Sequence, residues 1–305
     1  MYLSNHVKRT MAIDTLLTLT QNCIQRQNIL GGYLQFDYSK LVIASFSAPT
    51  PIESSVYQPL LCLVLQGEKQ VSAGEHQVRC NQAKMILVSH HIPVISQITQ
   101  ASMQTPYVAV ILPLDREKLL RYSDPTYTTH PADDGAAIGC HQVPNEVAQA
   151  LERLIELANE PTLAPMIAPL IEDEIHARLL HSEIGHRLMR LVWHGDKSAQ
   201  VAKIIKLIND DLSKNLSIAE LSKESGMSRS ALHQHFKTIT GMSPLTYAKE
   251  LRLLKAQTLV RESTRPIAMI GFEVGYDNSA QFSREYTRKF DKSPRQDRAT
   301  AAGIS

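Results

Sequence analysis

The chain has 305 residues, of which 43% are hydrophobic and 20% are charged, and its formal net charge is +2. This length and composition support about two folded domains and exclude disordered, collagen-like and coiled-coil rod proteins. The longest unbroken apolar run covers residues 60–65, far short of the roughly 20 residues that cross a bilayer, so no membrane span is expected.

Between residues 40 and 113 the sequence consists of short apolar, β-branched segments separated by turn signals. The clearest of these segments are 41–44, 60–65, 85–88, 94–98 and 108–112. Strands of this length and spacing predict a β-sandwich or a small barrel. Gly67 and Gly74 lie between strand candidates, where glycine adopts positive φ at little cost, and they predict a hairpin.

The same segment suggests what its interior could hold. We expect the apolar side chains of Leu63, Leu65, Ile86 and Val94 to face the interior. Basic residues are few and scattered there; they are Lys40, Lys69, Arg79 and Lys84. Small barrels can enclose one small molecule, so this pattern predicts a modest, mostly apolar ligand rather than a sugar phosphate.

The four cysteines, Cys23, Cys62, Cys80 and Cys140, lie far apart without a Cys-x-x-Cys pair. This spacing predicts reduced, buried thiols rather than a disulfide framework or a zinc site. The amino terminus carries charge but no following apolar stretch of the kind found in secretory signals, so we expect a cytoplasmic protein.

Beyond residue 115 the apolar periodicity becomes helical. Val147, Leu151 and Leu154 recur at intervals of three and four residues, and similar stripes follow up to about residue 192. A further helix containing Ile204, Ile205 and Ile208 leads into the last third of the chain. We therefore expect two domains, 1–196 and 197–305.

The last third is basic and contains an internal repeat. From Lys197 onward there are 18 Lys and Arg against 11 Asp and Glu, whereas the preceding part is net acidic. Segments 218–244 and 267–294 match at an offset of 49 that becomes 50 after the turn. Each contains a short helix, a glycine turn, a capping residue (Ser228 in the first copy, Asp277 in the second) and a longer helix, which is the helix-turn-helix pattern. A helix over 247–261 is expected to hold the two units apart.

The repeat resembles the DNA-binding domain of AraC/XylS transcription regulators. The resemblance rests on the runs 227–237 (MSRSALHQHFK), 241–247 (GMSPLTY), 274–276 (VGY) and 281–286 (QFSREY). The runs 57–67 (YQPLLCLVLQG) and 92–97 (IPVISQ) resemble the cupin-like sensor domain of one AraC-type subgroup. The resemblance implies an α+β protein with an amino-terminal cupin-like β-barrel, flanking helices and a carboxy-terminal all-α domain with two helix-turn-helix units.

Specific side chains are expected to read the DNA. Buried Leu232 and Phe236 would turn one face of the first recognition helix outward, and Phe282, Tyr286 and Phe290 would do the same in the second. The residues expected to contact bases are Ser230, His233, Gln234, Gln281 and Arg284, with Ala280 exposed beside them. Arginine binds guanine O6 and N7 bidentately and glutamine pairs with adenine. Arg229, Lys237 and Arg288 are expected to hold phosphates.

The resemblance also implies a sequence-specific regulator controlled by a small-molecule effector. The effector pocket is expected to include Cys62, His91 and Tyr107. Expected partners are double-stranded DNA, the unidentified effector, RNA polymerase if the protein is an activator, and a second copy in a homodimer. No metal and no cofactor is expected.

Two alternatives differ in what the amino-terminal domain does. A cupin enzyme is one. The chain lacks the His-x-His constellation of metal-dependent cupins, so such an enzyme would be metal-independent, and the chain also lacks any Gly-x-Ser-x-Gly elbow. Adjacent His90 and His91 would point to opposite faces of a strand, and His176, His181 and His186 would be spread around a helix surface. The second alternative is a ligand-independent DNA-binding protein whose amino-terminal domain only dimerises.

Overall fold

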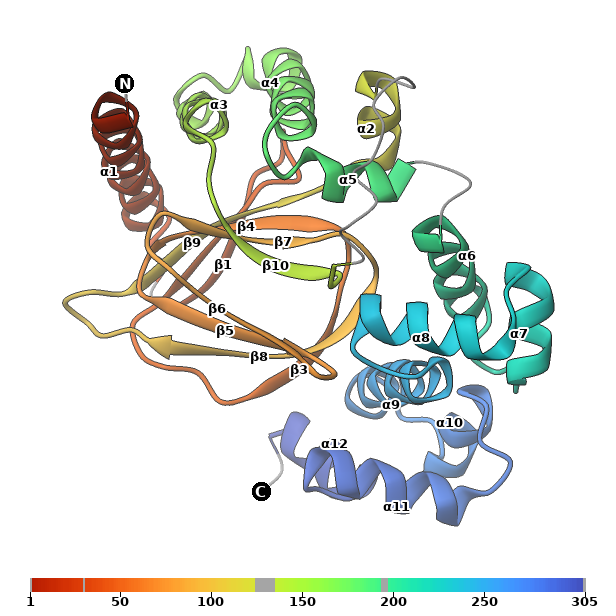
Figure 1. Cartoon of the computed structure of the whole chain (residues 1–305). Coiled ribbons are helices and arrows are strands. Elements are labelled where there is room, and N and C mark those ends of the chain that lie inside the picture. The colour runs from red at the N-terminus through yellow and green to blue at the C-terminus, as the bar shows by residue number, and fades with distance from the viewer. Residues whose placement is uncertain (1, 30, 124–134, 193–196, 304–305) are drawn as a thin grey trace.

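A computed structural model describes residues 2–29, 31–123, 135–192 and 197–303. Ten strands and the five α-helices that precede residue 193 form what we call the sheet region, the described residues between 2 and 192 (Figure 1). The strands are β1 (Gly31–Gln35), β2 (Val42–Phe46), β3 (Glu53–Tyr57), β4 (Leu60–Gln66), β5 (Glu68–Ala73), β6 (His76–Asn81), β7 (Lys84–Val88), β8 (Ile92–Gln100), β9 (Tyr107–Pro113) and β10 (Ile138–Gln142). The expected strand segments are all present.

The strands form two antiparallel sheets that are not closed into the expected barrel. One sheet has the order β1-β2-β9-β4-β7-β10, and the other has the order β3-β8-β5-β6. The sheets approach each other where β6 lies against β7 and β10. At the opposite side, the edge strands β1 and β3 are not hydrogen-bonded to each other within the described chain. The fold is therefore an open two-sheet version of the cupin-like architecture.

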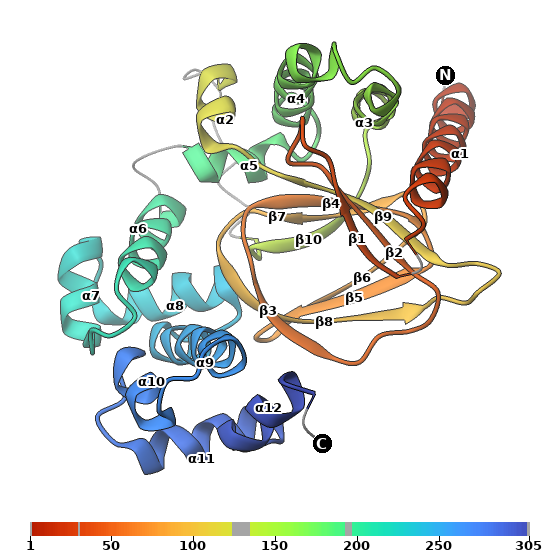
Figure 2. The ribbon, with the colours of Figure 1, turned by 180° about the vertical axis from the view of Figure 1, so that it is seen from behind.

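Helices cover the outer face of the six-stranded sheet (Figures 1 and 2). They are α1 (Tyr2–Arg26), α2 (Arg116–Tyr122), α3 (Asn145–Glu156), the 3-10 turn Leu157–Asn159, α4 (Ala164–Leu180) and α5 (Gly185–Val192). The inner strands β9, β4 and β7 of this sheet are buried on both faces, which explains their continuous apolar runs. In β4, Leu61, Leu63 and Leu65 pack under the helices, whereas Cys62 and Val64 face the other sheet.

This alternation corrects one expectation about the interior. Ile86 and Val94 do face the space between the sheets, but Leu63 and Leu65 belong to the core beneath the helices. Successive residues of a strand point to opposite faces, so a run that is apolar throughout does not reveal which residues face a ligand. Of the four residues, only Ile86 and Val94 therefore bear on which ligand the space between the sheets could hold.

A disulfide joins the two sheets, contrary to the reduced thiols expected from the sequence. Cys80 of β6 and Cys140 of β10 are bonded, with their Cα atoms 6.0 Å apart, a separation typical of disulfides. The two residues are 60 positions apart in the chain, and only the packing of β6 against β10 brings them together. Cys23 and Cys62 are buried free thiols, as expected.

The remaining helices form the helical region, residues 197–303. They are α6 (Lys197–Asp210), α7 (Ile218–Ser225), α8 (Arg229–Thr240), α9 (Pro244–Glu262), α10 (Ile267–Glu273), α11 (Ser279–Phe290) and α12 (Pro294–Ala301). Helices α7 and α8 form the first helix-turn-helix unit, and α10 and α11 form the second. The expected spacer is the 19-residue helix α9. None of the described helices has the length and apolar character that a bilayer crossing requires.

Candidate nucleic-acid interface and effector site

The turn of the first unit is fixed by local capping. Ser217 begins α7 with a capping box, in which its hydroxyl accepts from the Glu220 amide and the Glu220 carboxylate accepts from the Ser217 amide. Gly226 ends the helix at φ 71°, the left-handed conformation that glycine adopts readily. The Ser228 hydroxyl then accepts from the Ala231 amide and starts α8. These caps set the angle between the two helices.

The second unit repeats this design with one change. Gly275 adopts φ 90°, and a Cβ there would press on the backbone oxygens of Leu212 and Ser213. The cap of α11 is Asn278, whose side chain accepts from the Ala280 and Gln281 amides. The expected capping position was Asp277, one residue earlier. The extra residue in the second copy therefore moves the cap from Asp277 to Asn278.

The first recognition helix, α8, presents the expected face. Leu232 and Phe236 are fully buried. The exposed side chains on α8 recur three and four residues apart along one side, and they are Ser230, His233, Gln234 and Lys237, with Arg229 at the amino-terminal end. An α-helix with such a face fits the major groove of B-DNA.

Helix α11 presents an equivalent face. Phe282 and Tyr286 are fully buried, and Phe290 is partly buried against them. Gln281, Arg284 and Arg288 are exposed on the opposite side, and Ala280 is exposed next to them. Within the described chain, no carboxylate lies within 4 Å of the Arg284 or Arg288 guanidinium, so both charges are available to a ligand.

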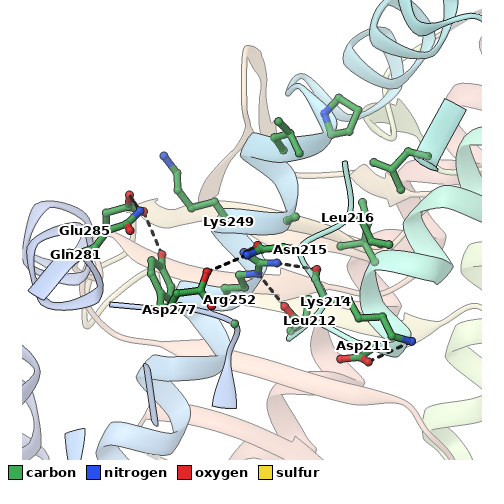
Figure 3. A pocket seen from close by; sticks show the side chains of 17 residues that line it. Asp211, Leu212, Lys214, Asn215, Leu216, Lys249, Arg252, Asp277, Gln281 and Glu285 are labelled. Carbon is green, nitrogen blue, oxygen red and sulfur yellow. Dashed lines mark hydrogen bonds and ion pairs between the residues drawn. The ribbon is translucent and has the colours of Figure 1, made fainter. Parts of the chain in front are cut away.

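A polar joint connects the two units (Figure 3). Arg252 of α9 donates to the Leu212 carbonyl at 2.8 Å, to the Lys214 carbonyl at 2.8 Å and to Asn215 Oδ1 at 3.0 Å. Asn215 in turn donates to Asp277, in the turn of the second unit, at 3.3 Å. The joint lines a groove between the units. Sequence reasoning did not find it, because Arg252 and residues 212–215 are distant in the chain.

The sheet region contacts the end of α8. Glu75, in the turn between β5 and β6, and His76, the first residue of β6, are the main contacts. The Glu75 amide donates to the Gly241 carbonyl at 3.1 Å, its carboxylate pairs with Lys237 at 2.7 Å, and His76 Nε2 lies 2.8 Å from the Thr238 carbonyl. Since Nε2 faces a carbonyl, it donates. Lys237, expected to hold a phosphate, is therefore bound to a carboxylate here.

Two further hydrogen bonds extend this interdomain contact. The Ala137 amide donates to the Ile239 carbonyl at 2.7 Å, and the Tyr247 hydroxyl donates to the His91 carbonyl at 2.8 Å. Gly74 and Gly241 allow the close approach: both have positive φ, and a Cβ on either would overlap the backbone of the facing segment. Apolar side chains of both regions form one continuous core there.

The expected effector residues are only partly brought together. Cys62 and Tyr107 are buried between the sheets, with Sγ 3.9 Å from the tyrosine hydroxyl oxygen. Burial raises the pKa of both groups. The His91 side chain is exposed, and its carbonyl belongs to the interdomain contact. Sequence reasoning missed Lys69, which is buried near Cys62; its alternation with Val71 and Ala73 along β5 was the available signal.

The histidines do not form a metal site in the part of the chain that the structure describes. No group of three or more His, Cys, Asp or Glu side chains there could hold a metal ion. His90 is buried whereas His91 is exposed, but both lie in the connection between β7 and β8 and not on the strand that the sequence predicts. The surface position expected for His176 is wrong: it is 1% exposed, its Nε2 accepts from the Asp115 amide at 2.9 Å, and its Nδ1 donates to the Glu172 carbonyl.

Two family models match the chain. The model described as "AraC-type transcriptional regulator N-terminus" matches residues 37–187, and one described as "Helix-turn-helix domain" matches residues 221–300. The wild-type ToxT structure from Vibrio cholerae strain SCE256, which contains an unsaturated fatty acid, has a TM-score of 0.54 at 10% identity, over 87% of this chain and 97% of ToxT. That likeness shows the fold alone.

Curated relatives match the helical region. The regulatory protein SoxS of Salmonella typhimurium is 33% identical over 94 residues, which are 31% of this chain and 88% of SoxS. The transcriptional activator RhaS of Klebsiella pneumoniae is 30% identical over 100 residues, which are 33% of this chain and 36% of RhaS. The match thus spans about a third of RhaS but most of SoxS. The chain belongs to the AraC family of transcriptional regulators.

Proposed function

We propose that the chain recognises a specific double-stranded DNA sequence with residues 197–305 and that residues 1–196 regulate this binding. The observation that carries the proposal is the pair of outward faces on α8 and α11, joined by one rigid helix. Helix α9 has 19 residues, which corresponds to about 28 Å at 1.5 Å per residue. Two successive major-groove faces lie about 34 Å apart, so the spacer suits one chain that reads both.

The exposed side chains divide into readers and holders. Ser230, His233 and Gln234 on α8, with Gln281 and Arg284 on α11, would contact base edges, because they are exposed in the amino-terminal half of each recognition helix. Arg229, Lys237 and Arg288 lie toward the helix flanks and would hold phosphates. Arg284 and Arg288 are both exposed and have no carboxylate within 4 Å among the described residues, which supports their contact with DNA.

The contact between the regions supports control by the sheet region. Lys237 cannot hold a phosphate while it is paired with Glu75, so an arrangement that binds DNA fully would have to break this contact. An effector bound between the sheets would favour one arrangement by its differential affinity for the two. We assign Cys62 and Tyr107 to the surroundings of that effector, and His91 to the interdomain contact.

The remaining roles follow from a regulator of this family. RhaS is named as an activator, and we propose the same direction here, with RNA polymerase as a partner and a homodimer as the assembly. DNA binding would place the chain in the cytoplasm. SoxS and RhaS are both named as regulators, so we propose no enzymatic activity.

Selection from a random duplex pool tests the proposal. The purified full chain, at about 100 mM salt, should enrich one motif whose affinity exceeds that of random duplex by roughly a thousandfold or more. A double variant, Gln234→Ala with Arg284→Ala, should lose the enrichment while Lys40→Ala, an exposed change in the sheet region, should retain it. Equal binding to selected and random DNA would refute sequence-specific recognition.

A further inference from the structure

Lys69 is a buried amine in the otherwise apolar space between the two sheets. It is 9% exposed and shares the inward face of β5 with Val71 and Ala73, which are fully buried. Its Nζ atom lies 5.5 Å from the centre of the Tyr57 ring. Lys69 also interacts electrostatically with Cys62 and Tyr33. We call Lys69, Tyr33, Tyr57, Cys62 and Tyr107 the polar cluster.

The polar cluster contains a cation without a matching anion. Among the described residues, no carboxylate lies within 4 Å of Lys69 Nζ; Glu68, the preceding residue, points to the other face and hydrogen-bonds Thr99. Burial by itself lowers the pKa of Lys69, but its polar neighbours, Tyr57 first among them, outweigh burial and raise it. Burial raises the pKa of Cys62 and Tyr107, so both stay neutral at pH 7.

An uncompensated buried charge is costly in a folded protein. Taking an ammonium group out of water is unfavourable unless an opposite charge or several hydrogen bonds replace the lost solvation. The face of the Tyr57 ring, 5.5 Å from Lys69 Nζ, supplies a weak cation–π attraction. This attraction does not neutralise the charge. The site is therefore complementary to a ligand that brings one negative charge.

The polar cluster lies next to the open side of the two sheets. Tyr33 is on β1 and Tyr57 ends β3, and these two strands are the unpaired edges of their sheets. Tyr33 is 59% exposed, whereas Tyr107 is 1% exposed. The cluster thus extends from an exposed side chain at the sheet edge to the buried interior.

We propose that Lys69 binds the carboxylate of a small acid whose apolar body packs between the two sheets. The inference rests on the proposed function, because it names the chemistry of the effector. One ammonium balances one carboxylate, and the hydroxyls of Tyr57 and Tyr107 are donors for the same carboxylate. A phosphate dianion would need a second cation, and no other basic side chain belongs to the cluster. The apolar neighbours, among them Ile86, Val94 and Ile98, select an apolar body.

The position of the site connects it to the helical region. The residues that face the space between the sheets and the core of the first helix-turn-helix unit belong to the same continuous core. Ile92 and Val94 of β8 share that core with Phe236 of α8 and Tyr247 of α9. A ligand that displaces side chains in this layer therefore acts on the packing that supports α8.

Titration calorimetry on the full chain at pH 7.5 tests the site with matched probes. Octanoate, decanoate and 1-naphthoate are each compared with the corresponding primary alcohol, which keeps the apolar body and lacks the charge. At least one acid should bind ten times or more tightly than its alcohol. Lys69→Met, which keeps the length of the side chain and removes the charge, should reduce the affinity of that acid at least tenfold and leave the alcohol unaffected.

The control variant is Lys40→Met, which removes an exposed lysine of the same region and should bind as the unaltered chain does. If Lys69→Met does not fold, Tyr57→Phe replaces it and should weaken the acid severalfold, because a hydrogen-bond donor is lost. The proposal is overturned if none of the acids binds more tightly than its alcohol, or if Lys69→Met binds the acid unchanged. DNA selection with the same preparation, without ligand, reports separately on the proposed function.

Discussion

The two helix-turn-helix units share a sequence pattern but differ in what surrounds them. The first unit shares its apolar core with the sheet region, and the end of α8 is bound to Glu75, His76 and Ala137. The second unit has a separate core with α9, built around Phe282 and Tyr286. No hydrogen bond or ion pair links the described residues of α11 to the sheet region. The first unit is thus coupled directly to the sheet region, whereas the second unit has no such direct hydrogen bond or ion pair through α11.

Helix α9 contributes side chains to the cores of both units. Its Tyr247 and Leu251 belong to the core shared with the sheet region, whereas its Leu253, Ala256 and Val260 belong to the core of the second unit. The change from one core to the other occurs within one turn of the helix. A displacement of the first unit would therefore be transmitted through a helix that the second unit also uses.

The largest expected effect concerns the separate core of the second unit. Asp297 is 2% exposed and accepts hydrogen bonds from Tyr286 at 2.6 Å and from Arg261 at 3.1 Å. Asp297→Ala should lower the free energy of unfolding of this unit by about 3 kcal/mol, because the buried Tyr286 hydroxyl loses its acceptor and the half-exposed Arg261 loses its ion pair. Asp291→Asn is the control, since its left-handed position tolerates asparagine. Urea unfolding measures the stability of both variants. Equal stabilities would contradict a core of the second unit that depends on Asp297.

The same carboxylate predicts a pH dependence. Burial by itself raises the pKa of Asp297, but hydrogen bonds from Arg261 and Tyr286 outweigh it, so the pKa is lowered in the folded protein. The unfolded value is about 3.9. The stabilisation is therefore complete above the unfolded pKa and is lost as the pH falls through the folded pKa. Asp297→Asn should remove part of the loss of unfolding free energy that is measured between about pH 5 and pH 2. The same pH dependence in the variant and in the unaltered chain would show that Asp297 does not contribute to it.

The disulfide between the sheets has the next largest effect. Cys80→Ser should lower the free energy of unfolding of the sheet region by about 2–4 kcal/mol, because the bond closes a long loop in the unfolded chain. Reductant should destabilise the unaltered protein by a similar amount and leave the variant unchanged. A variant that remains sensitive to reductant would show that another thiol pair is involved.

Reading and holding should be separable at the two recognition helices. Arg284→Ala should cost roughly 1–3 kcal/mol on the selected site and relax the preference at one base pair. Lys237→Ala should weaken all sequences alike and flatten the salt dependence by about one phosphate contact. Fluorescence anisotropy over a salt series distinguishes the two outcomes. Identical effects on selected and random duplex would contradict the division of roles.

The smallest expected effect tests the contact that distinguishes the units. Glu75→Gln breaks the pair with Lys237, whose side chains are 69% and 53% exposed. Exposed pairs contribute about 0–1 kcal/mol, so DNA affinity should rise by at most about fivefold. Glu160→Gln changes the net charge equally at an exposed site away from α8 and should have a smaller effect. If both variants bind DNA equally, Glu75 does not compete with phosphate.

Features set by local periodicity could be predicted from the sequence. The strand segments, the two recognition helices and the exposed positions Ser230, His233, Gln234, Gln281 and Arg284 follow from the alternation of buried and exposed residues along one element. The offset between the repeats also indicated the extra residue before α11, although the capping side chain is Asn278 and not Asp277.

Features that depend on two elements meeting could not be predicted. The disulfide requires β6 to lie against β10, and the pairing of Lys237 with Glu75 requires a hairpin of the sheet region to reach α8. The burial of Lys69 follows from its alternation with Val71 and Ala73, but one must know that this face of β5 points toward the other sheet. In each case the missing information is the packing of segments distant in the chain.

A base-resolved hydroxyl-radical footprint of the full chain on its selected site tests the central claim most directly. Two reading heads held by α9 should protect two segments about one helical turn, or 34 Å, apart on one face of the duplex. Arg284→Ala should weaken protection at one segment and Gln234→Ala at the other. A single protected segment, or the loss of both segments together in each variant, would contradict a chain that reads DNA with two separate units.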